Sequence, residues 1–356
     1  MIRVAIVGAG IGAEHLAGYR ALPDRFSVDV MCDLDLARAA KAVGADDSIR
    51  VFADLAAVLS NPEIDLVDIC LPPHLHLTAV LEALAAGKHA ICEKPLATSL
   101  ADVDRIEATV TGSQCRVFPV FQYRYGRAMA QLKALRDAGM LGRPLVASAE
   151  THWNRGADYY ATPWRGTWAG EAGGAILGHA IHAHDLLCHV MGPVATVSAH
   201  LATRVNDIDV DDCAAISMVM QSGALMTSSV TLGAARDTSR LRYCFEKLTA
   251  ESGSAPYTPA EDVWTFTARG DARQQDVDRV IDAVPVVRSG FEGFLEAVAD
   301  ALEGRAADDV SLRDARQSVE LVTALYTAAR ETRLVRLPLD KTAALYGGWV
   351  SGQAEE

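Results

Sequence analysis

The sequence has no hydrophobic run long enough to span a bilayer, no closely spaced pair of cysteines and no excess of basic residues. A membrane-spanning helix needs about 20 consecutive apolar residues. The 33 basic and 46 acidic residues give a formal net charge of −13, which argues against nucleic acid and anionic membranes as partners. We therefore expect a globular protein whose partner is a small molecule.

The seven cysteines are scattered, and several fall in expected strands. This distribution is typical of buried, reduced thiols and predicts a cytoplasmic protein. Aromatic residues are scarce at 6%, whereas hydrophobic residues make up 50% of the chain. With 356 residues the chain is long enough for two domains with substantial cores.

A glycine-rich turn follows the first expected strand directly. Residues 1–7 form a short apolar, β-branched run, and helical character begins at Glu14. Between them, Gly8 suits a tight turn, and Gly10 lets a pyrophosphate approach the backbone. Ile11 and Gly12 lie at the helix start, where free N–H groups bind phosphate. This segment predicts a dinucleotide-binding site.

An acid at the end of the second expected strand indicates which dinucleotide binds. Residues 27–32 form that strand, and Asp33 follows it. A carboxylate there accepts hydrogen bonds from the ribose hydroxyls of NAD and repels a 2′-phosphate. Leu34 supplies no positive charge, and we expect Arg38 to be a solvated residue of the next helix. The sequence therefore favours NAD over NADP.

Strand and helix signals alternate as far as residue 121. Expected strands at 64–71, 89–92 and 115–121 are separated by expected helices at 77–86 and 101–110. This alternation predicts an α/β fold, with a doubly wound parallel Rossmann sheet in a domain over residues 1–121. Ligands bind at the carboxyl ends of such strands. Asp33, Pro72 with Pro73, and the sequence Glu93-Lys94-Pro95 all lie at such ends.

The pattern changes after residue 122. Longer strand-like runs follow, such as 212–221 and 224–231, with a helical segment near 174–191. They predict a second domain over residues 122–340, of α+β class with a largely antiparallel sheet, and a tail over 341–356. Two final helices, near 290–303 and 312–331, are expected to pack against one domain or to bridge both.

The order of these motifs resembles the glucose–fructose oxidoreductase, inositol dehydrogenase and MocA (Gfo/Idh/MocA) family. The resemblance rests on the glycine turn from Gly8, Asp33, Pro72-Pro73-x-x-His76, the segment 86–95 ending in Glu93-Lys94-Pro95, and Gly173-Gly174 followed by His182-x-x-Asp185. It implies a Rossmann domain beside an open antiparallel sheet that often forms the subunit interface, hence a homodimer or homotetramer. It also implies NAD(P)-dependent oxidation or reduction of a sugar, polyol or glycoside.

The resemblance assigns roles to individual residues. Lys94 becomes the catalytic lysine, and its ammonium group can stabilise the developing oxyanion. His182 becomes the acid/base that takes the hydroxyl proton, with Asp185 one helical turn away to orient or tune it. The implied lining of the nicotinamide pocket is Leu71, Pro72, Pro73, His76, Glu93, Lys94 and Gln122, with Arg124 close to the nicotinamide or the substrate.

One position departs from the family pattern. Many members carry an acid four residues before the catalytic histidine, where this chain has Gly178. The neighbouring His179 is a candidate to replace it. His179, His182, His184 and His189 also suggest a metal site, but no matching carboxylate pattern accompanies them, and we expect no metal. We expect His15, just past the glycines, to pack or to face the phosphates.

An aromatic segment over residues 150–168 precedes the His182 helix. It holds three of the five tryptophans and two of the nine tyrosines, together with Arg155 and Arg165. Such side chains can form a substrate wall that stacks on a sugar ring and bonds its hydroxyls, or they can simply fix a loop over the core. The two arginines leave an acidic sugar, such as a uronate, open. The expected substrate contacts are Lys94, Arg124, His152, Tyr160, Trp164, Arg165, His179 and His182.

Two other functions stay open beside a sugar dehydrogenase. A lyase or glycosidase that retains NAD and oxidises its substrate only transiently is compatible with the missing acid and with His179. A non-catalytic NAD-binding sensor is the second alternative. The presence of both Lys94 and His182 argues against a sensor, because a binding module needs no lysine beside a hydride acceptor.

Overall fold

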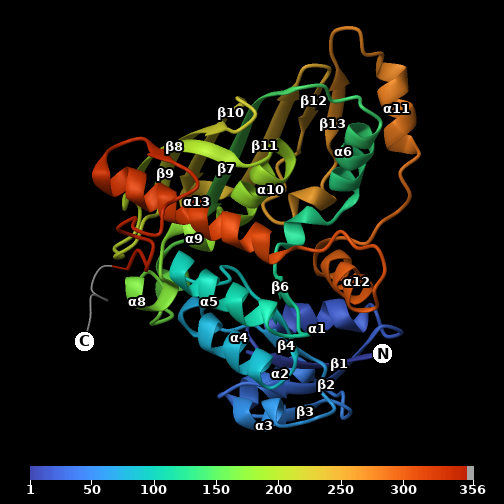
Figure 1. Cartoon of the computed structure of the whole chain (residues 1–356), viewed down its shortest axis with the longest axis vertical. Helices are drawn as coiled ribbons and strands as arrows, with labels where there is room; N and C mark the ends of the chain where they lie inside the picture. Colours follow the sequence, from blue (N-terminus) through green and yellow to red (C-terminus); the bar gives the residue numbers. More distant parts are fainter. Residues whose placement is uncertain (351–356) are drawn as a thin grey trace. The chain divides into compact units, whose positions relative to one another are not determined.

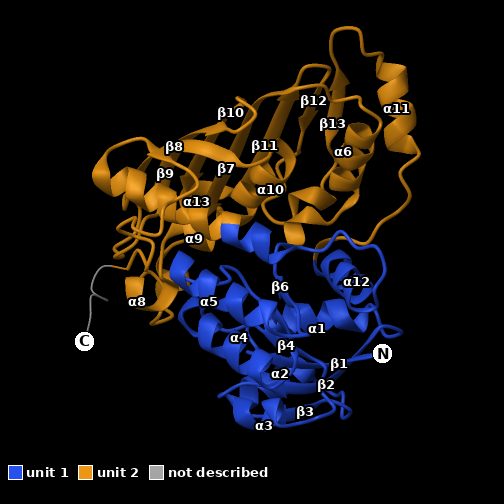
Figure 2. Ribbon diagram, in the orientation of Figure 1, with its two compact units in different colours: residues 1–121, 291–316 blue, residues 122–290, 317–356 orange. Residues whose placement is uncertain are grey.

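The computed structural model describes residues 1–350, and the chain forms two compact units (Figures 1 and 2). The first unit comprises Met1–Phe121 and Phe291–Arg316. The second comprises Gln122–Gly290 and the chain from Gln317 onward.

A parallel sheet forms the centre of the first unit. Its six strands lie in the order β3-β2-β1-β4-β5-β6, and every pair is parallel. The strands are β1 (Ile2–Val7), β2 (Phe26–Cys32), β3 (Arg50–Phe52), β4 (Leu66–Ile69), β5 (His89–Cys92) and β6 (Val117–Pro119). The strand order reverses between β1 and β4, and such a reversal is where ligands bind in open α/β sheets. The expected doubly wound sheet is confirmed.

Helices connect consecutive strands of this sheet. They are α1 (Gly12–Arg20), α2 (Leu36–Val43), α3 (Leu55–Leu59), the short η1 (Pro73–Leu75), α4 (His76–Ala85) and α5 (Leu100–Thr111). Side chains that accept backbone N–H bonds begin several of them: Asp35 caps α2, Asp54 caps α3 and Ser99 caps α5. These caps fix where each helix starts after its loop.

A late segment of the chain returns to the first unit. Helix α12 (Gly290–Leu302) packs Phe291 and Leu295 against Gly18 of α1, where an added Cβ would lie 3.2 and 3.0 Å from them. Arg25 forms ion pairs with Asp300 and Glu303 at 2.9 and 3.0 Å. The segment thus joins the first unit through both apolar packing and charge pairs.

The second unit is built on an eight-stranded sheet in the order β13-β12-β11-β7-β10-β9-β8-β14. Its strands are β7 (Pro144–Asn154), β8 (Val194–Ala202), β9 (Cys213–Met220), β10 (Leu225–Thr231), β11 (Gly233–Phe245), β12 (Leu248–Glu251), β13 (Thr265–Ala268) and β14 (Val335–Arg336). All pairs are antiparallel except β7 with β10. This confirms the expected α+β architecture with a largely antiparallel sheet.

Helices of the second unit complete its core. They are η2 (Gln122–Arg124), α6 (Arg127–Asp137), α7 (Ala157–Tyr160), α8 (Trp168–Glu171), α9 (Ala175–Gly178), α10 (Ile181–Met191), η3 (Pro259–Glu261), α11 (Gln274–Asp282) and the part of α13 (Leu312–Glu331) that follows Arg316. Helices α9 and α10 pack on β7, β9, β10 and β11. Residues of β9 and β10 alternate between buried and exposed, so these helices cover one face of the sheet.

The other face of this sheet carries an exposed apolar group. Leu225 of β10 pairs with Val219 of β9 on one side and with Val146 of β7 on the other. The three residues are 53%, 37% and 46% exposed, respectively. Neighbouring strands thus present a contiguous apolar strip to solvent.

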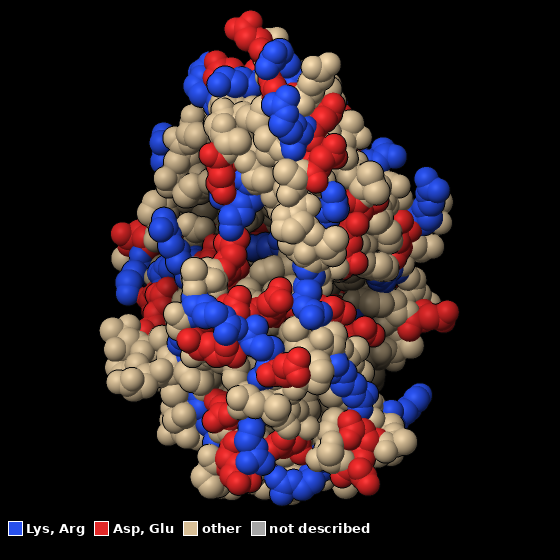
Figure 3. Space-filling view, turned by 90° about the vertical axis from the view of Figure 1, so that its right-hand side faces the viewer, with Lys and Arg blue, Asp and Glu red and all other residues tan. Residues whose placement is uncertain are grey.

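On the face shown in Figure 3, acidic and basic side chains are intermingled. No helix within residues 1–350 is both long and apolar enough to cross a membrane.

Candidate active site

The glycine turn after β1 leaves space where a phosphate can approach. Gly8 has φ +101°, and a Cβ added there would lie 2.3 Å from the carbonyl oxygen of Cys70. A Cβ on Gly12 would lie 2.8 Å from the Ile6 side chain, whereas one on Gly10 would meet nothing within 4 Å. Within residues 1–350 the backbone N–H groups of Gly10 and Ile11 donate no hydrogen bond. The turn therefore fits a pyrophosphate at the start of α1.

Asp33 is buried at the end of β2, where an NAD ribose would be recognised. It accepts hydrogen bonds from the backbone N–H groups of Ala9 at 2.7 Å and Asp35 at 2.8 Å. Burial alone would raise the pKa of Asp33, but the bonds from Arg38, Ala9 and Asp35 outweigh burial and lower it. The carboxylate is therefore ionised.

Arg38 is not merely a solvated residue, contrary to the expectation from the sequence. Its Nε and Nη2 atoms donate to the two carboxylate oxygens of Asp33 at 3.0 and 2.6 Å. The guanidinium remains 55% exposed. Arg38 thus neutralises Asp33 from the solvent side.

Lys94 lies on the turn that follows β5. Its backbone N–H donates to Oε2 of the buried Glu93 at 3.0 Å, and a cis peptide bond joins it to Pro95. His76, at the start of α4, contacts this turn through Nδ1, 2.6 Å from the carbonyl oxygen of Pro95. Its Nε2 lies 2.7 Å from the carbonyl oxygen of Leu71. His76 therefore connects the loops at the carboxyl ends of β4 and β5.

His182 lies in the second unit, near the start of α10, and is buried. The Tyr123 ring stacks on it with the ring centroids 4.4 Å apart. One turn along the helix, Asp185 accepts two bonds from Arg124, at 2.6 and 2.7 Å, with both side chains nearly buried. The structure therefore brings η2 and α10 together, and it commits the Asp185 carboxylate to Arg124. The buried Gln122 lies on the same short helix η2.

The segment before α9 is fixed by a buried acid that the sequence analysis did not identify. Asp211 accepts bonds from the backbone N–H groups of Gly174 and Ile176 and from the hydroxyl group of Tyr326, at 3.2, 3.0 and 2.8 Å. A Cβ on Gly174 would lie 2.0 Å from the carbonyl oxygen of Asp211. Gly174 thus permits a close approach of the two backbone segments.

His179 ends α9 and lies among the aromatic residues of the 150–168 segment. Its ring centroid is 5.4 Å from that of Trp153 and 5.5 Å from that of Tyr159. Residues 154–159 line an open hollow of about 610 Å³ next to these rings. Tyr159 also packs against Tyr160. The aromatic segment therefore contacts the residue that follows α9.

The two arginines of this segment have different surroundings. Arg155 lies over the rings of Trp153 and Tyr159 and donates to Asp237 at 2.8 Å. Arg165 lies 3.9 Å from the Tyr159 ring centroid and 4.7 Å from that of Trp164. Its ion pair with Glu171 spans 3.7 Å, which is longer than a hydrogen bond. Burial lowers the pKa of Arg165, so its charge is incompletely compensated.

The structure does not place His152 beside His179 and its aromatic neighbours. Residues alternate across β7, and the buried Trp153 points to the covered face of the sheet. His152 therefore lies on the opposite face, with its Nε2 atom 2.9 Å from the Ser229 hydroxyl. The structure gives it no place beside His179.

The chain matches family models over both units. Residues 2–121 match the model described as an oxidoreductase family with an NAD-binding Rossmann fold. Residues 129–251 match the Gfo/Idh/MocA C-terminal domain. The chain belongs to the Gfo/Idh/MocA family. The expected family and its NAD cofactor are confirmed at this level.

Among solved structures, this Gfo/Idh/MocA chain is similar to the WlbA dehydrogenase from Chromobacterium violaceum, determined with NADH and UDP-GlcNAcA. The two are 30% identical with a TM-score of 0.83, covering 95% of this chain and 96% of that one. Among curated proteins, it is 35% identical to an inositol 2-dehydrogenase from Streptomyces avermitilis, over 43% of this chain and 45% of the relative. It is 29% identical to a levoglucosan dehydrogenase from Pseudarthrobacter phenanthrenivorans, over 57% and 55%. The chain thus spans about half the length of these curated relatives.

The family acid missing at Gly178 is not excluded by packing. A Cβ on Gly178 would meet nothing within 4 Å. On the same part of the chain, His184 of α10 lies 3.0 Å from the Ser228 hydroxyl, and burial lowers its pKa to about 4. His184 is therefore a neutral core residue. The α10 histidines form no metal-ligating group within residues 1–350, where the one cluster of such side chains is His15, Asp68 and Cys70.

Proposed function

We propose that this chain is an NAD-dependent dehydrogenase of a sugar, polyol or glycoside. The observation that carries the proposal lies within the first unit. The open phosphate site at Gly10, the buried acid Asp33 and the turn that bears Lys94 all lie at the carboxyl ends of strands of the parallel sheet. This arrangement suits a dinucleotide whose nicotinamide end reaches the carboxyl ends of β4 and β5.

We assign individual residues to the steps of hydride transfer. NAD, when bound, supplies the hydride acceptor. His182 takes the hydroxyl proton as the C–O bond gains carbonyl character, and the Lys94 ammonium stabilises the oxyanion. Stacking on Tyr123 supports the orientation of His182, because a stacked ring has few alternative rotamers. Leu71, Pro72, Pro73, His76, Glu93 and Gln122 are proposed to line the nicotinamide pocket.

The proposed substrate is a cyclic carbohydrate or polyol. The relatives are named for inositol and levoglucosan, and the WlbA structure holds a nucleotide-linked sugar. The aromatic segment offers ring faces for such a substrate. Tyr160, Trp164, Arg165 and His179 remain the proposed contacts.

We also propose a homodimer or homotetramer in the cytoplasm. The apolar strip of Val146, Val219 and Leu225 lies on the open sheet face, and exposed apolar patches of monomers usually mark interaction sites. All seven cysteines are free thiols, as a reducing compartment requires.

The test is a spectrophotometric screen at 340 nm for NADH formation. Purified protein is assayed with NAD and NADP against sugars, inositols, uronic acids and glycosides. NAD-dependent turnover of one class supports the proposal. Conversion of a glycoside without net NADH, seen by product analysis, would assign the retained-NAD lyase instead. NAD binding with no conversion of any compound would favour the sensor.

A further inference from the structure

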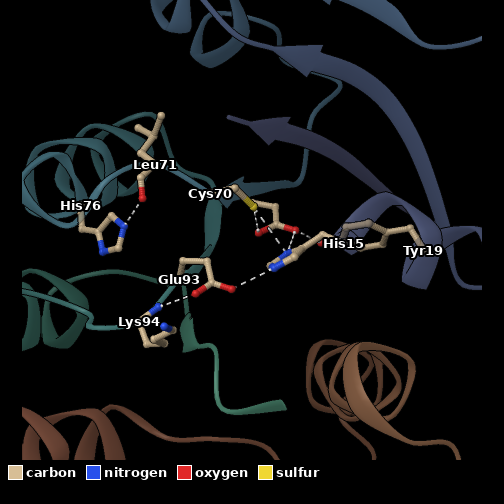
Figure 4. Close-up of polar contacts among 8 residues, drawn as sticks. His15, Tyr19, Cys70, Leu71, His76, Glu93 and Lys94 are labelled. Atoms are coloured by element: carbon tan, nitrogen blue, oxygen red, sulfur yellow. Dashed lines mark hydrogen bonds and ion pairs between the residues drawn. The ribbon is translucent and has the colours of Figure 1, made fainter. Parts of the chain in front are cut away.

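A buried chain of polar side chains lies under the sheet edge of the first unit (Figure 4). His15 of α1 and Asp68 of β4 are fully buried, and Glu93 after β5 is 6% exposed. Nδ1 of His15 lies 2.8 Å from Oδ2 of Asp68, and Nε2 lies 3.2 Å from Oε1 of Glu93. One imidazole therefore connects two carboxylates from neighbouring strands. His15 is therefore packed in the core, which is one of the two placements expected for it.

The geometry assigns a charge to His15. A neutral imidazole has one N–H donor, whereas both ring nitrogens here face a carboxyl oxygen, and an imidazolium satisfies both contacts when the two carboxylates are ionised. Burial alone would lower the pKa of His15, but Asp68 opposes burial and raises it well above its ordinary value. Asp68 also accepts from the Tyr19 hydroxyl at 2.9 Å and from the Cys70 thiol at 3.5 Å.

The chain of bonds ends at the turn that carries Lys94. Glu93 uses Oε1 for His15 and Oε2 for the backbone N–H of Lys94. On the other side of this turn, His76 contacts the carbonyl oxygen of Pro95. The backbone of Lys94 is thus held on both sides by buried groups.

We propose that His15 is a positioning residue, which links Asp68 to Glu93 and so holds the turn that carries Lys94 in the geometry hydride transfer needs. This inference rests on the proposed function, because it assumes that Lys94 acts in catalysis. Replacing a buried set of ions by apolar residues is often neutral or stabilising. Stability of the core alone therefore does not require His15, Asp68 and Glu93. The bond from Glu93 to the Lys94 backbone N–H indicates instead that the triad positions Lys94.

A metal ion does not explain the cluster better. The ligating atoms of His15, Asp68 and Cys70 are already joined to one another by contacts at 2.8, 3.5 and 3.6 Å. These distances are those of hydrogen bonds. The proton on His15 already occupies the position between the atoms that a cation would need.

The test compares His15→Gln with a matched variant, Tyr19→Phe, in the full-length protein. Tyr19→Phe removes another donor from the same Asp68 oxygen but leaves the link from His15 to Glu93 intact. For each variant we would measure kcat and KM on the substrate found by the screen, the NAD dissociation constant by calorimetry, and the thermal unfolding midpoint. These readouts separate turn geometry from cofactor binding and from stability.

We expect His15→Gln to lower kcat by about 10- to 100-fold, the usual cost of a small misplacement of a reacting group. KM and the NAD dissociation constant should stay within about threefold, since neither the phosphate cradle nor Asp33 changes. Tyr19→Phe should keep kcat within about twofold of the wild type, even if its unfolding midpoint falls as far as that of His15→Gln. The double variant His15→Gln/Glu93→Gln should be no slower than the slower single variant, because the two substitutions break the same contact between His15 and Glu93.

A fall in kcat that is equal for Tyr19→Phe and His15→Gln would overturn the inference, since a structural loss affects both. If His15→Gln does not fold, Glu93→Gln breaks the same link from the other end, and a kcat within twofold of the wild type would overturn it equally. Lys94→Ala is the reference for the proposed function. Full activity of Lys94→Ala removes both proposals, whereas inactive Lys94→Ala with active His15→Gln removes only this one.

Discussion

Replacing Asp33 by asparagine should shift the cofactor preference from NAD toward NADP. Asp33 is the buried acceptor at the end of β2. Its two carboxylate oxygens accept hydrogen bonds from Nη2 and Nε of Arg38, at 2.6 and 3.0 Å. Asparagine keeps the size of Asp33, but its one acceptor oxygen can take only one of the two bonds from the N–H groups of Ala9 and Asp35, which go to different oxygens of Asp33. The variant loses charge-assisted bonds to the ribose, which contribute about 2–3 kcal/mol. This corresponds to a roughly 30- to 150-fold weaker NAD affinity. The released Arg38 guanidinium, already 55% exposed, becomes available to a 2′-phosphate.

Calorimetric titration of NAD and NADP into the wild type, Asp33→Asn and Arg38→Ala checks this expectation. Arg38→Ala is the control, because an ion pair with an exposed arginine contributes little free energy. The NAD affinity of this variant should therefore stay within about threefold of the wild type. NADP affinity should rise in Asp33→Asn and fall back in the double variant. An NAD affinity unchanged in Asp33→Asn, or a wild type that binds both cofactors equally, would refute the role given to Asp33.

Three further outcomes are expected. Lys94→Ala and His182→Ala should each reduce kcat by about 10²- to 10⁴-fold in steady-state assays, with the NAD dissociation constant nearly unchanged. Gly8→Ala should lower both the unfolding midpoint and NAD affinity, because its Cβ would lie 2.3 Å from the Cys70 carbonyl oxygen at φ +101°. His184 has its pKa lowered by burial to about 4, so its contribution is complete above pH 6.5 and is lost as pH falls toward 4. Urea unfolding of His184→Gln should therefore lose up to about 3 kcal/mol of the wild-type dependence on pH in this window.

The sheet of the first unit could be predicted because each signal is local. Buried parallel strands are short apolar runs, and glycine at Gly8 marks the turn after one of them. The return of residues 291–316 could not be predicted in the same way. It depends on Phe291 and Leu295 finding Gly18 of α1, and on Arg25 finding Asp300, contacts that no local pattern specifies.

The candidate site shows the same division. Motif positions such as Asp33 and Lys94 were identified, but their partners were not. Arg38 was expected in solvent, and His15 either packed or facing the phosphates. Their contacts with Asp33, and with Asp68 and Glu93, were not predicted, because the sequence does not show which side chains meet across elements. The position of His152 was available from the period of β7, since the neighbouring Trp153 is a typical core residue and adjacent residues point to opposite faces.

Three arginines differ in how closely an acidic partner neutralises them. Arg124 gives two of its bonds to Asp185, and Arg155 bonds to Asp237 at 2.8 Å. Both charges are therefore neutralised before any substrate arrives. Arg165 differs, because its partner Glu171 is 3.7 Å away and aromatic rings cover much of the remaining guanidinium surface. A uronate would bring a second carboxylate to this guanidinium, whereas a neutral sugar would leave its charge to Glu171 alone. Arg165, and neither of the other two arginines, is therefore the group that would distinguish an acidic sugar from a neutral one.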